Sequence, residues 1–254
     1  MIPVVSAYAK AKNYVEYHSQ LTEQEMIQLK KKNPGVTLTI SRQSGIDTNI
    51  LCTKLDENFS DYYQTNWVYF DKELFEKVIS DHNLPPRIQK FLTEQKVPAF
   101  SQMLNELLGI HPPIRKLIHK MASTILNLAE IGNVILIGRG ANVISANLKN
   151  AYHVRLVAPL EERINFYLET TDVSRERAKK ILLNEDENRR DFLFRTFKKD
   201  IDDPLIYNIT INVSKYNLEE LTKTIFEAVK VKQYKRVDHN TTRVKLNSEI
   251  KVNI

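Results

Sequence analysis

Short, almost continuous apolar runs alternate with longer mixed segments through most of the chain. Val134–Ile137 is wholly apolar, and Arg155 is the one formally charged residue in Tyr152–Val157. Runs of this length and composition are typical of strands that are covered on both faces. The same pattern predicts further strands at Val36–Ile40, Trp67–Phe70 and Ile206–Val213.

Helical segments separate these strands. The predicted helices cover about Thr48–Phe59, Ile114–Glu130 and Leu218–Lys230, and two more begin at Pro159 and Ser174. Proline is favoured at the start of a helix, and Ser174 is a typical N-cap residue. Strands separated by helices predict an α/β fold, here a three-layer, doubly wound sheet of five parallel strands.

The two ends of the chain differ from this alternating core. Residues 1–35 are polar, with a predicted helix from Thr22 to Lys31, and are expected to form an N-terminal helical appendage to a domain at 36–231. In residues 232–254, apolar side chains occupy alternate positions, which predicts a C-terminal β extension. That extension is a candidate hairpin partner, edge strand or subunit contact, so the terminal segments are where a homo-oligomer would form.

Composition narrows the functional class. The chain has 254 residues and one cysteine, Cys52, which excludes an internal disulfide framework and favours a reducing compartment. It contains no apolar run of membrane-spanning length and no segment of signal-peptide form, so we expect a cytoplasmic protein that does not enter a membrane. A net charge of +6 suits a phosphorylated ligand. Nucleic acid is disfavoured, because the basic flanks carry few aromatic side chains on which bases could stack.

Polar and glycine residues follow three predicted strands. Ser41-Arg-Gln-Ser-Gly45 comes after the first strand, Asp71 after the second, and Gly138-Arg139-Gly140 after the third. Ligands of open α/β sheets bind at the carboxyl ends of the strands, so these residues predict a site for a phosphorylated ligand. Arg139 between two glycines would present a guanidinium fork to a phosphate, or it would pair with a nearby carboxylate.

Arginines also gather late in the helix that begins at Ser174. Arg189 and Arg190 could close over phosphates as a lid, since arginine clamps suit transferring phosphoryl groups. Both also stand three or four residues from Asp186, a spacing that produces ion pairs on any solvated helix. The sequence leaves both interpretations open.

From Val36 to about Val229 the chain resembles the cytidylate kinase-like family of bacterial P-loop kinases. The resemblance rests on the segments Thr39–Gly45, Val68–Leu74, Ile135–Ala141, Val154–Arg163, Asp186–Arg189 and Asp203–Tyr207, together with Asn212 and Ser214. It implies transfer of the γ-phosphoryl group of ATP, with Mg²⁺, to a nucleoside monophosphate such as CMP. It also implies a helical acceptor-binding region at 71–131 and a lid-like region at 174–204.

The resemblance assigns roles to individual residues. Those expected to bind the triphosphate are Arg42, Gln43, Ser44, Gly45, Thr48 and Asn49, and those expected to bind the acceptor are Asp71, Gly138, Arg139 and Gly140. The expected catalytic residues are Arg139, Arg189 and Arg190. No residue of the sequence is assigned as a metal ligand.

The loop after the first strand departs from the family pattern. Ile46 and Asp47 follow Gly45 where the family has further glycines, no lysine is present in the loop, and Ile50 replaces the hydroxyl that would ligate Mg²⁺. A carboxylate at this position repels a bound anion. The sequence therefore leaves two hypotheses: an active nucleotide kinase, or an inactive kinase-like module that binds a nucleotide or a protein in a regulatory role.

Overall fold

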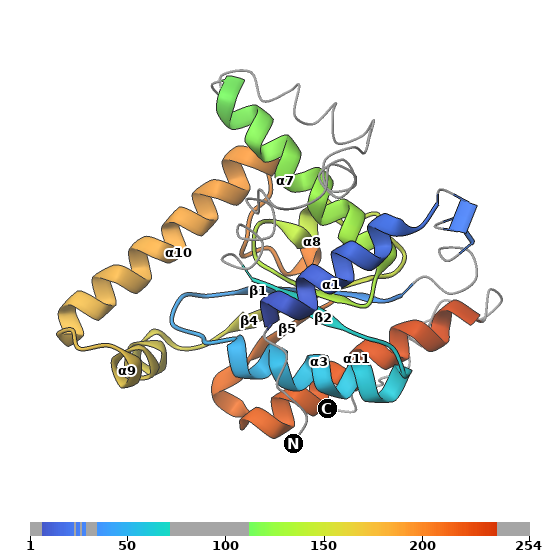
Figure 1. The fold of residues 1–254 in the computed structure, drawn as a ribbon. Helices are drawn as coiled ribbons and strands as arrows, with labels where there is room; N and C mark the ends of the chain where they lie inside the picture. Colours follow the sequence, from blue (N-terminus) through green and yellow to red (C-terminus); the bar gives the residue numbers. More distant parts are fainter. Residues whose placement is uncertain (1–6, 23, 26, 29–34, 72–111, 238–254) are drawn as a thin grey trace, which may run out of the picture.

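A single parallel sheet forms the centre of the molecule (Figure 1). The computed structural model describes residues 7–22, 24–25, 27–28, 35–71 and 112–237. The five strands are β1 (Thr37–Arg42), β2 (Val68–Phe70), β3 (Val134–Ile137), β4 (Ala151–Val157) and β5 (Ile209–Asn212). They lie in the order β2-β3-β1-β4-β5, and every pair is parallel.

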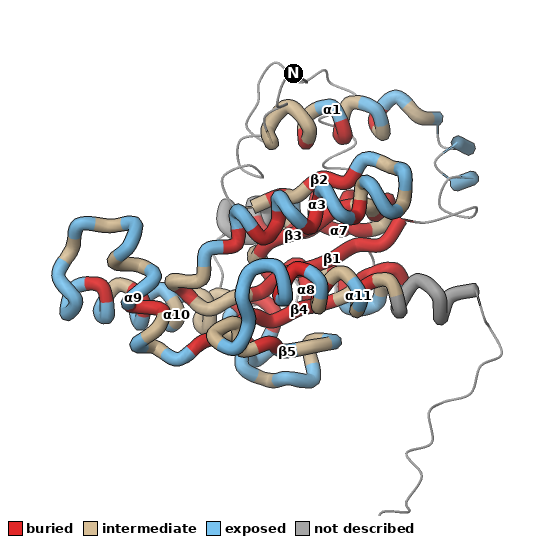
Figure 2. The backbone as a smooth tube through the Cα atoms, turned by 90° about the horizontal axis from the view of Figure 1, so that it is seen from below, coloured by how far each residue is buried: buried red, intermediate tan, exposed pale blue. Residues whose placement is uncertain are grey.

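Helices cover both faces of this sheet, as the alternating pattern predicts. Helices α3 (Asn49–Tyr63) and α11 (Leu218–Val237) lie on one face, and α1 (Ala7–Gln20), α7 (Pro112–Ile131) and α8 (Ala141–Ile144) lie on the other. Two apolar clusters correspond to these layers, one around Leu38, Phe59 and Trp67 and the other around Leu128 and Leu136. Strands β1, β3 and β4 are almost completely buried, whereas β5 at the edge of the sheet is partly exposed (Figure 2).

Two further helices extend from the carboxyl end of the sheet. Helix α9 (Leu160–Thr170) packs on the first half of α10 (Arg175–Phe197) through Ile164 and Leu182. The last part of α10 packs on α7 through Phe197 and Ile118. The predicted cap at Ser174 is confirmed, because its side chain accepts a hydrogen bond from the Arg177 N–H. Helix α10 is therefore fixed at both ends.

The N-terminal segment contains a helix that the sequence pattern did not predict. Helix α1 packs against β2 and α7, with Ala11, Tyr14 and Val15 buried. The Tyr14 hydroxyl donates a 2.6 Å hydrogen bond to the Gly132 carbonyl, and Lys10 lies 2.9 Å from the Asp56 carboxylate. Residues 7–20 therefore contribute to the core. Only part of the predicted Thr22–Lys31 helix is described, and residues 24–25 and 27–28 of it are helical.

Other boundaries differ from the sequence predictions for local reasons. Helix α11 continues to Val237, beyond the predicted end at Lys230. Strand β5 begins at Ile209 instead of Ile206, because a short 3₁₀ helix at Pro204–Ile206 precedes it. Asp203 caps that turn by accepting a hydrogen bond from the Leu205 N–H.

Two predicted regions lie largely outside the described residues. The proposed acceptor-binding region at 71–131 is described only at Asp71 and in α7, and the predicted strand at 244–254 is not described at all. Across the residues that are described, each helix is either too short or too polar to cross a bilayer.

Candidate functional site

A pocket of about 490 Å³ opens where β1 and β3 end against α10. We name it the strand-end pocket. Its polar lining consists of Ser41, Arg42, Gly138, Arg139, Gly140, Asn142, Glu185, Asn188 and Arg189, and its apolar lining of Ile137, Phe192, Leu193 and Ile201. It thus brings together predicted residues from three separate segments, and its lining contains both arginines and apolar side chains.

The turn after β3 allows its neighbours to approach closely. Gly138, Arg139 and Gly140 all have positive φ angles, between 55° and 72°. A Cβ atom on Gly138 would lie 2.9 Å from Arg42 Nη1, and one on Gly140 would lie 2.5 Å from the Phe197 ring. Only glycine fits at those two positions, because a side chain would both strain the backbone and displace these groups.

Arg42 belongs to strand β1, and its guanidinium lines the strand-end pocket beside Gly138. This guanidinium makes no hydrogen bond or ion pair with any residue in the described ranges. Burial lowers the pKa of Arg42, and the positive charge of Arg189 lowers it further, while Asp71 and Glu185 act in the opposite direction. An arginine in such a setting still carries its charge at neutral pH. Among the described residues, the pocket therefore contains a cation with no counter-group in contact.

Arg189 lies between the pocket and the loop after β1. Its guanidinium donates to the Arg42 carbonyl oxygen at 3.4 Å and lies 3.4 Å from Glu185 and 3.7 Å from Asp186. Burial lowers the pKa of Arg189, and the two carboxylates oppose that shift. The predicted pairing with Asp186 is therefore present, and the side chain still faces the pocket.

Arg190 points to a different group of side chains. Its guanidinium donates to Asp202 at 2.8 and 3.2 Å and to Glu187 at 2.6 Å. The hydrogen bond to Asp202 raises the pKa of Arg190. The structure therefore places Arg190 in surface ion pairs, outside the lining of the strand-end pocket.

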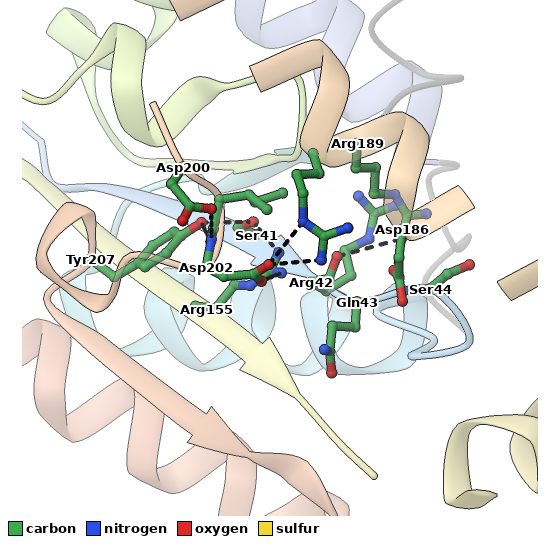
Figure 3. A network of polar contacts seen from close by, with 12 residues as sticks. Ser41, Arg42, Gln43, Ser44, Arg155, Asp186, Arg189, Asp200, Asp202 and Tyr207 are labelled. Carbon is green, nitrogen blue, oxygen red and sulfur yellow. Dashed lines mark hydrogen bonds and ion pairs between the residues drawn. The ribbon is translucent and has the colours of Figure 1, made fainter. Parts of the chain in front are cut away.

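The loop after β1 is held by carboxylates from α10. The Ser44 N–H donates to Asp186 at 2.7 Å, and the Ser44 hydroxyl donates to Glu185 (Figure 3). Buried Arg163 binds the other side, donating to the Ser44 carbonyl at 3.0 Å and to Asp186 at 2.6 Å. A P-loop would offer such an N–H to a phosphate, but here a carboxylate of the same chain accepts it.

The rest of the loop is also engaged internally. The Gln43 side chain accepts a hydrogen bond from the Ala158 N–H at 2.9 Å. Asp47 accepts one from the Asn49 N–H at 2.8 Å, so a carboxylate occupies the N-terminus of α3. Thr48 is buried at the N-cap and makes no side-chain capping bond. Gly45 has a φ of 83° and lies against the Arg163 backbone.

These residues do not fit a magnesium–triphosphate complex. The loop has no lysine, Ile50 is 60% exposed where a ligating hydroxyl would stand, and Thr53 donates its hydroxyl to the Asn49 carbonyl at 3.0 Å. Within the described part of the chain, no three His, Cys, Asp or Glu side chains are grouped so that they could hold a metal ion. Cys52 is buried, and burial raises the pKa of its thiol, so this side chain stays protonated and is a poor metal ligand. We therefore derive no chemical step through Mg²⁺ or ATP.

Comparison with known proteins identifies the family. The model of the cytidylate kinase-like family matches residues 37–215. The chain belongs to the cytidylate kinase-like family. Among solved structures, the chain is similar to the crystal structure of an uncharacterized protein from Eubacterium ventriosum ATCC 27560, with 18% identity, a TM-score of 0.59, and coverage of 77% of this chain and 98% of that one. No curated protein matches the chain.

The family assignment and the sheet topology agree. Five parallel strands with helices on both faces form a P-loop kinase-like fold, as the sequence predicts. At 18% identity, the structural match supports the fold alone. A nucleotide-kinase-like framework is thus established for this chain, while the roles expected of individual residues remain predictions.

Sequence reasoning missed a buried polar network beside the pocket. Arg155 on β4 is 5% exposed and donates to Ser41 at 2.9 Å and to Asp202 at 3.2 Å. The Tyr207 hydroxyl donates to the Ile201 carbonyl at 2.9 Å (Figure 3). The sequence did contain a sign of this network, because Arg155 is the one charged residue in an otherwise buried strand and would need polar partners there. The network fixes Ser41 at the pocket edge.

Asn142 follows the third strand with the glycine turn, but the sequence assigned it no role in the site. It lies in α8, directly after the glycine turn, and lines the pocket. Its position two residues beyond Gly140 was the only available signal, because a single asparagine does not distinguish a binding residue from a capping residue.

Proposed function

We propose that this protein is a nucleotide-binding member of the cytidylate kinase-like family that holds a nucleoside monophosphate in its strand-end pocket. CMP is the first candidate. In this proposal the protein is a catalytically inactive kinase-like module with a regulatory role, and the loop after β1 does not bind ATP. The observation that carries the proposal is a contrast. The Arg42 guanidinium has no hydrogen-bond or ion-pair partner among the described residues, whereas the N–H and hydroxyl of Ser44 both donate to carboxylates of α10.

The pocket suits a monophosphate in both charge and shape. Arg42, Arg139 and Arg189 place positive charge at one wall, and arginine forks match the geometry of phosphate oxygens. Phe192 and its apolar neighbours form a second wall that suits a base or ribose. A volume of about 490 Å³ lies within the range of small-molecule sites.

The loop argues against a triphosphate. To reach the Ser44 N–H, a phosphate must displace Asp186, which also holds Arg163 at 2.6 Å. It would then face Asp47 at the N-terminus of α3. Both carboxylates repel a polyanion, and the loop offers no lysine to offset them.

Calorimetric titration with CMP in the absence of Mg²⁺ tests this function. We expect saturable binding by the wild-type chain and at least tenfold weaker binding by Arg139→Ala, since a charge-assisted phosphate contact contributes about 1.5–3 kcal/mol. Arg195→Ala is the matched control, because Arg195 is 74% exposed and, among the described residues, pairs with Asp191 on its own helix. Absence of CMP binding by the wild-type chain would contradict the proposal.

A second candidate function is transfer of the γ-phosphoryl group of ATP, with Mg²⁺, to a nucleoside monophosphate such as CMP. The family match favours it, as does the short chain distance from Arg42 in the pocket to Ser44 in the loop. It requires Glu185 and Asp186 to leave the loop. Formation of CDP from ATP and CMP, lost in Arg139→Ala, would support this candidate over the first.

Cellular location and assembly belong to the same proposal. We expect a cytoplasmic protein, and we expect residues 1–35 or 232–254 to mediate any homo-oligomer. Sedimentation of the full chain and of a chain ending at Val237 tests the second point, since loss of a dimer in the shorter chain would assign the contact to the C-terminal segment.

A further inference from the structure

Asn142 is a buried amide without a hydrogen-bond partner. The residue is 5% exposed, and its Nδ2 atom is buried with no partner in the described part of the chain. Buried amide donors are almost always satisfied, because leaving one unpaired is costly. Trp67 Nε1 is also buried without a partner among the described residues, but it lies in the core, whereas Asn142 lines the strand-end pocket, where a ligand atom can serve as the acceptor.

Asn150 is a buried asparagine with a structural role, and it serves as a comparison for Asn142. It is also 5% exposed, and its Nδ2 atom donates to the Gly35 carbonyl at 2.9 Å and to the Ala129 carbonyl at 2.7 Å. Asn142 has the same side chain and the same burial but no such bonds. The difference is its place, since Asn142 lines the strand-end pocket.

The surroundings of Asn142 indicate which ligand atom would satisfy it. Arg42 and Arg139 supply positive charge in the same pocket, so an anionic oxygen is the acceptor that the pocket favours. The amide of asparagine can turn about its last torsion at little cost, which lets its N–H groups face a bound group. A neutral donor adds a hydrogen bond without adding further repulsion among the arginines.

We propose that Asn142 is a ligand-binding residue that donates its amide N–H to a phosphoryl oxygen of the phosphate monoester held by Arg42 and Arg139. This inference rests on the proposed function and adds a contact to the same site. It implies that Asn142 carries a cost in the free protein that ligand binding relieves.

The test compares Asn142→Ala, Asn142→Ser and Asn142→Asp with the wild-type chain, using CMP and ribose 5-phosphate as probes in calorimetry. We expect Asn142→Ala to weaken binding of both probes about tenfold or more, since it removes a hydrogen bond to a charged group. Asn142→Asp should weaken both further, because its carboxylate repels the phosphate. Asn142→Ser keeps a hydrogen-bond donor, so its affinity for both probes should lie between that of the wild-type chain and that of Asn142→Ala.

Thermal unfolding without ligand supplies the second readout. Asn142→Ala should unfold at the wild-type temperature or above it, whereas Asn150→Ala should unfold at a lower temperature because it loses two hydrogen bonds. Asn184→Ala, an exposed position outside the pocket, controls for the substitution itself.

Each outcome decides a separate point. Wild-type affinity for both probes in Asn142→Ala would overturn the inference and leave the proposed function standing. Weaker binding of CMP alone would also overturn it, because the contact would then be to the base. If the wild-type chain binds neither probe, the proposed function fails, and the inference fails with it.

Discussion

The arginines beside the strand-end pocket differ in their contacts: buried Arg155 and Arg163 hold parts of the fold together, whereas half-buried Arg42 lines the pocket. Arg155 bonds to Ser41 and Asp202, and Arg163 bonds to two backbone carbonyls and to Asp186. The Arg42 guanidinium makes no such bond within the described residues. Because burying an uncompensated charge is costly, its retention at the pocket wall indicates a binding role.

Replacing Arg42 by alanine should therefore separate binding from stability. We expect CMP affinity to fall about 10- to 100-fold, since a hydrogen bond to a charged group contributes about 1.5–3 kcal/mol. The unfolding midpoint should stay level or rise, because the substitution removes a confined cation without breaking an internal bond. Calorimetry and chemical denaturation measure the two effects, with Arg195→Ala as control. Unchanged CMP affinity would show that Arg42 faces no ligand.

At the scale of elements, helix α10 connects the loop, the pocket and α9. Asp186 and Glu185 bind Ser44 on one side, Arg189 faces the pocket, and Arg163 reaches from α9. This arrangement makes the position of α10 depend on a buried ion pair, with side-chain exposures of 5% for Arg163 and 16% for Asp186.

Arg163→Met should loosen this contact. Removing one partner of a buried pair leaves the other uncompensated, and we expect a loss of about 3 kcal/mol in the free energy of unfolding. Arg175→Met is the matched control, since the Arg175–Glu161 pair is exposed and should contribute less than about 1 kcal/mol. Urea denaturation of both variants measures the difference. Equal losses would show that the Asp186 contact does not stabilise the fold.

Helix α1 introduces a pH dependence. His18 contacts the Tyr14 ring at a centroid distance of 4.3 Å, and its Nδ1 atom lies 2.8 Å from the Tyr14 carbonyl. Burial lowers the pKa of His18 from its ordinary value of 6.5, against a smaller opposing effect of that hydrogen bond. The unfolded chain therefore binds the proton more tightly, so this contribution to stability is present above pH 6.5 and is lost as the pH falls through the folded-state pKa.

The expected result is a lower unfolding midpoint at pH 5 than at pH 7, with a smaller difference in His18→Phe. Phenylalanine keeps the aromatic contacts with Tyr14 and Tyr17 and removes the titrating group. Thermal unfolding across that range is the measurement. If the unfolding midpoint of His18→Phe changes with pH as much as that of the wild-type chain, another group causes the pH dependence.

Considered as a whole molecule, the fold was largely predictable from the sequence, and the site only in part. Apolar runs such as Val134–Ile137 locate strands, because burial on both faces leaves no room for polar side chains. The strand order is a property of the whole chain, so the pattern could not show that β1 lies beside β3. That adjacency is what brings Arg42 next to Gly138.

Contacts between distant segments explain what the sequence left open. Ser44 meets Asp186 across 142 positions of the chain, and no local pattern encodes that pairing. Helix α1 was missed because only Ala11, Tyr14, Val15 and Ser19 are buried, and its apolar stripe is weak. Side-chain partners, which distinguish Arg42 from Arg190, likewise appear only in the folded chain.

The central claim is that this kinase-like protein binds a monophosphate while its own carboxylates close the triphosphate loop. Calorimetric titration of MgATP into the protein, first alone and then saturated with CMP, tests it most directly. The account predicts that CMP binds without Mg²⁺ and that MgATP gives no binding heat in either titration. Asp186 and Glu185 already accept the hydrogen bonds of Ser44, and Asp47 at the N-terminus of α3 repels a phosphate. Saturable binding of MgATP to the CMP-bound protein would contradict it.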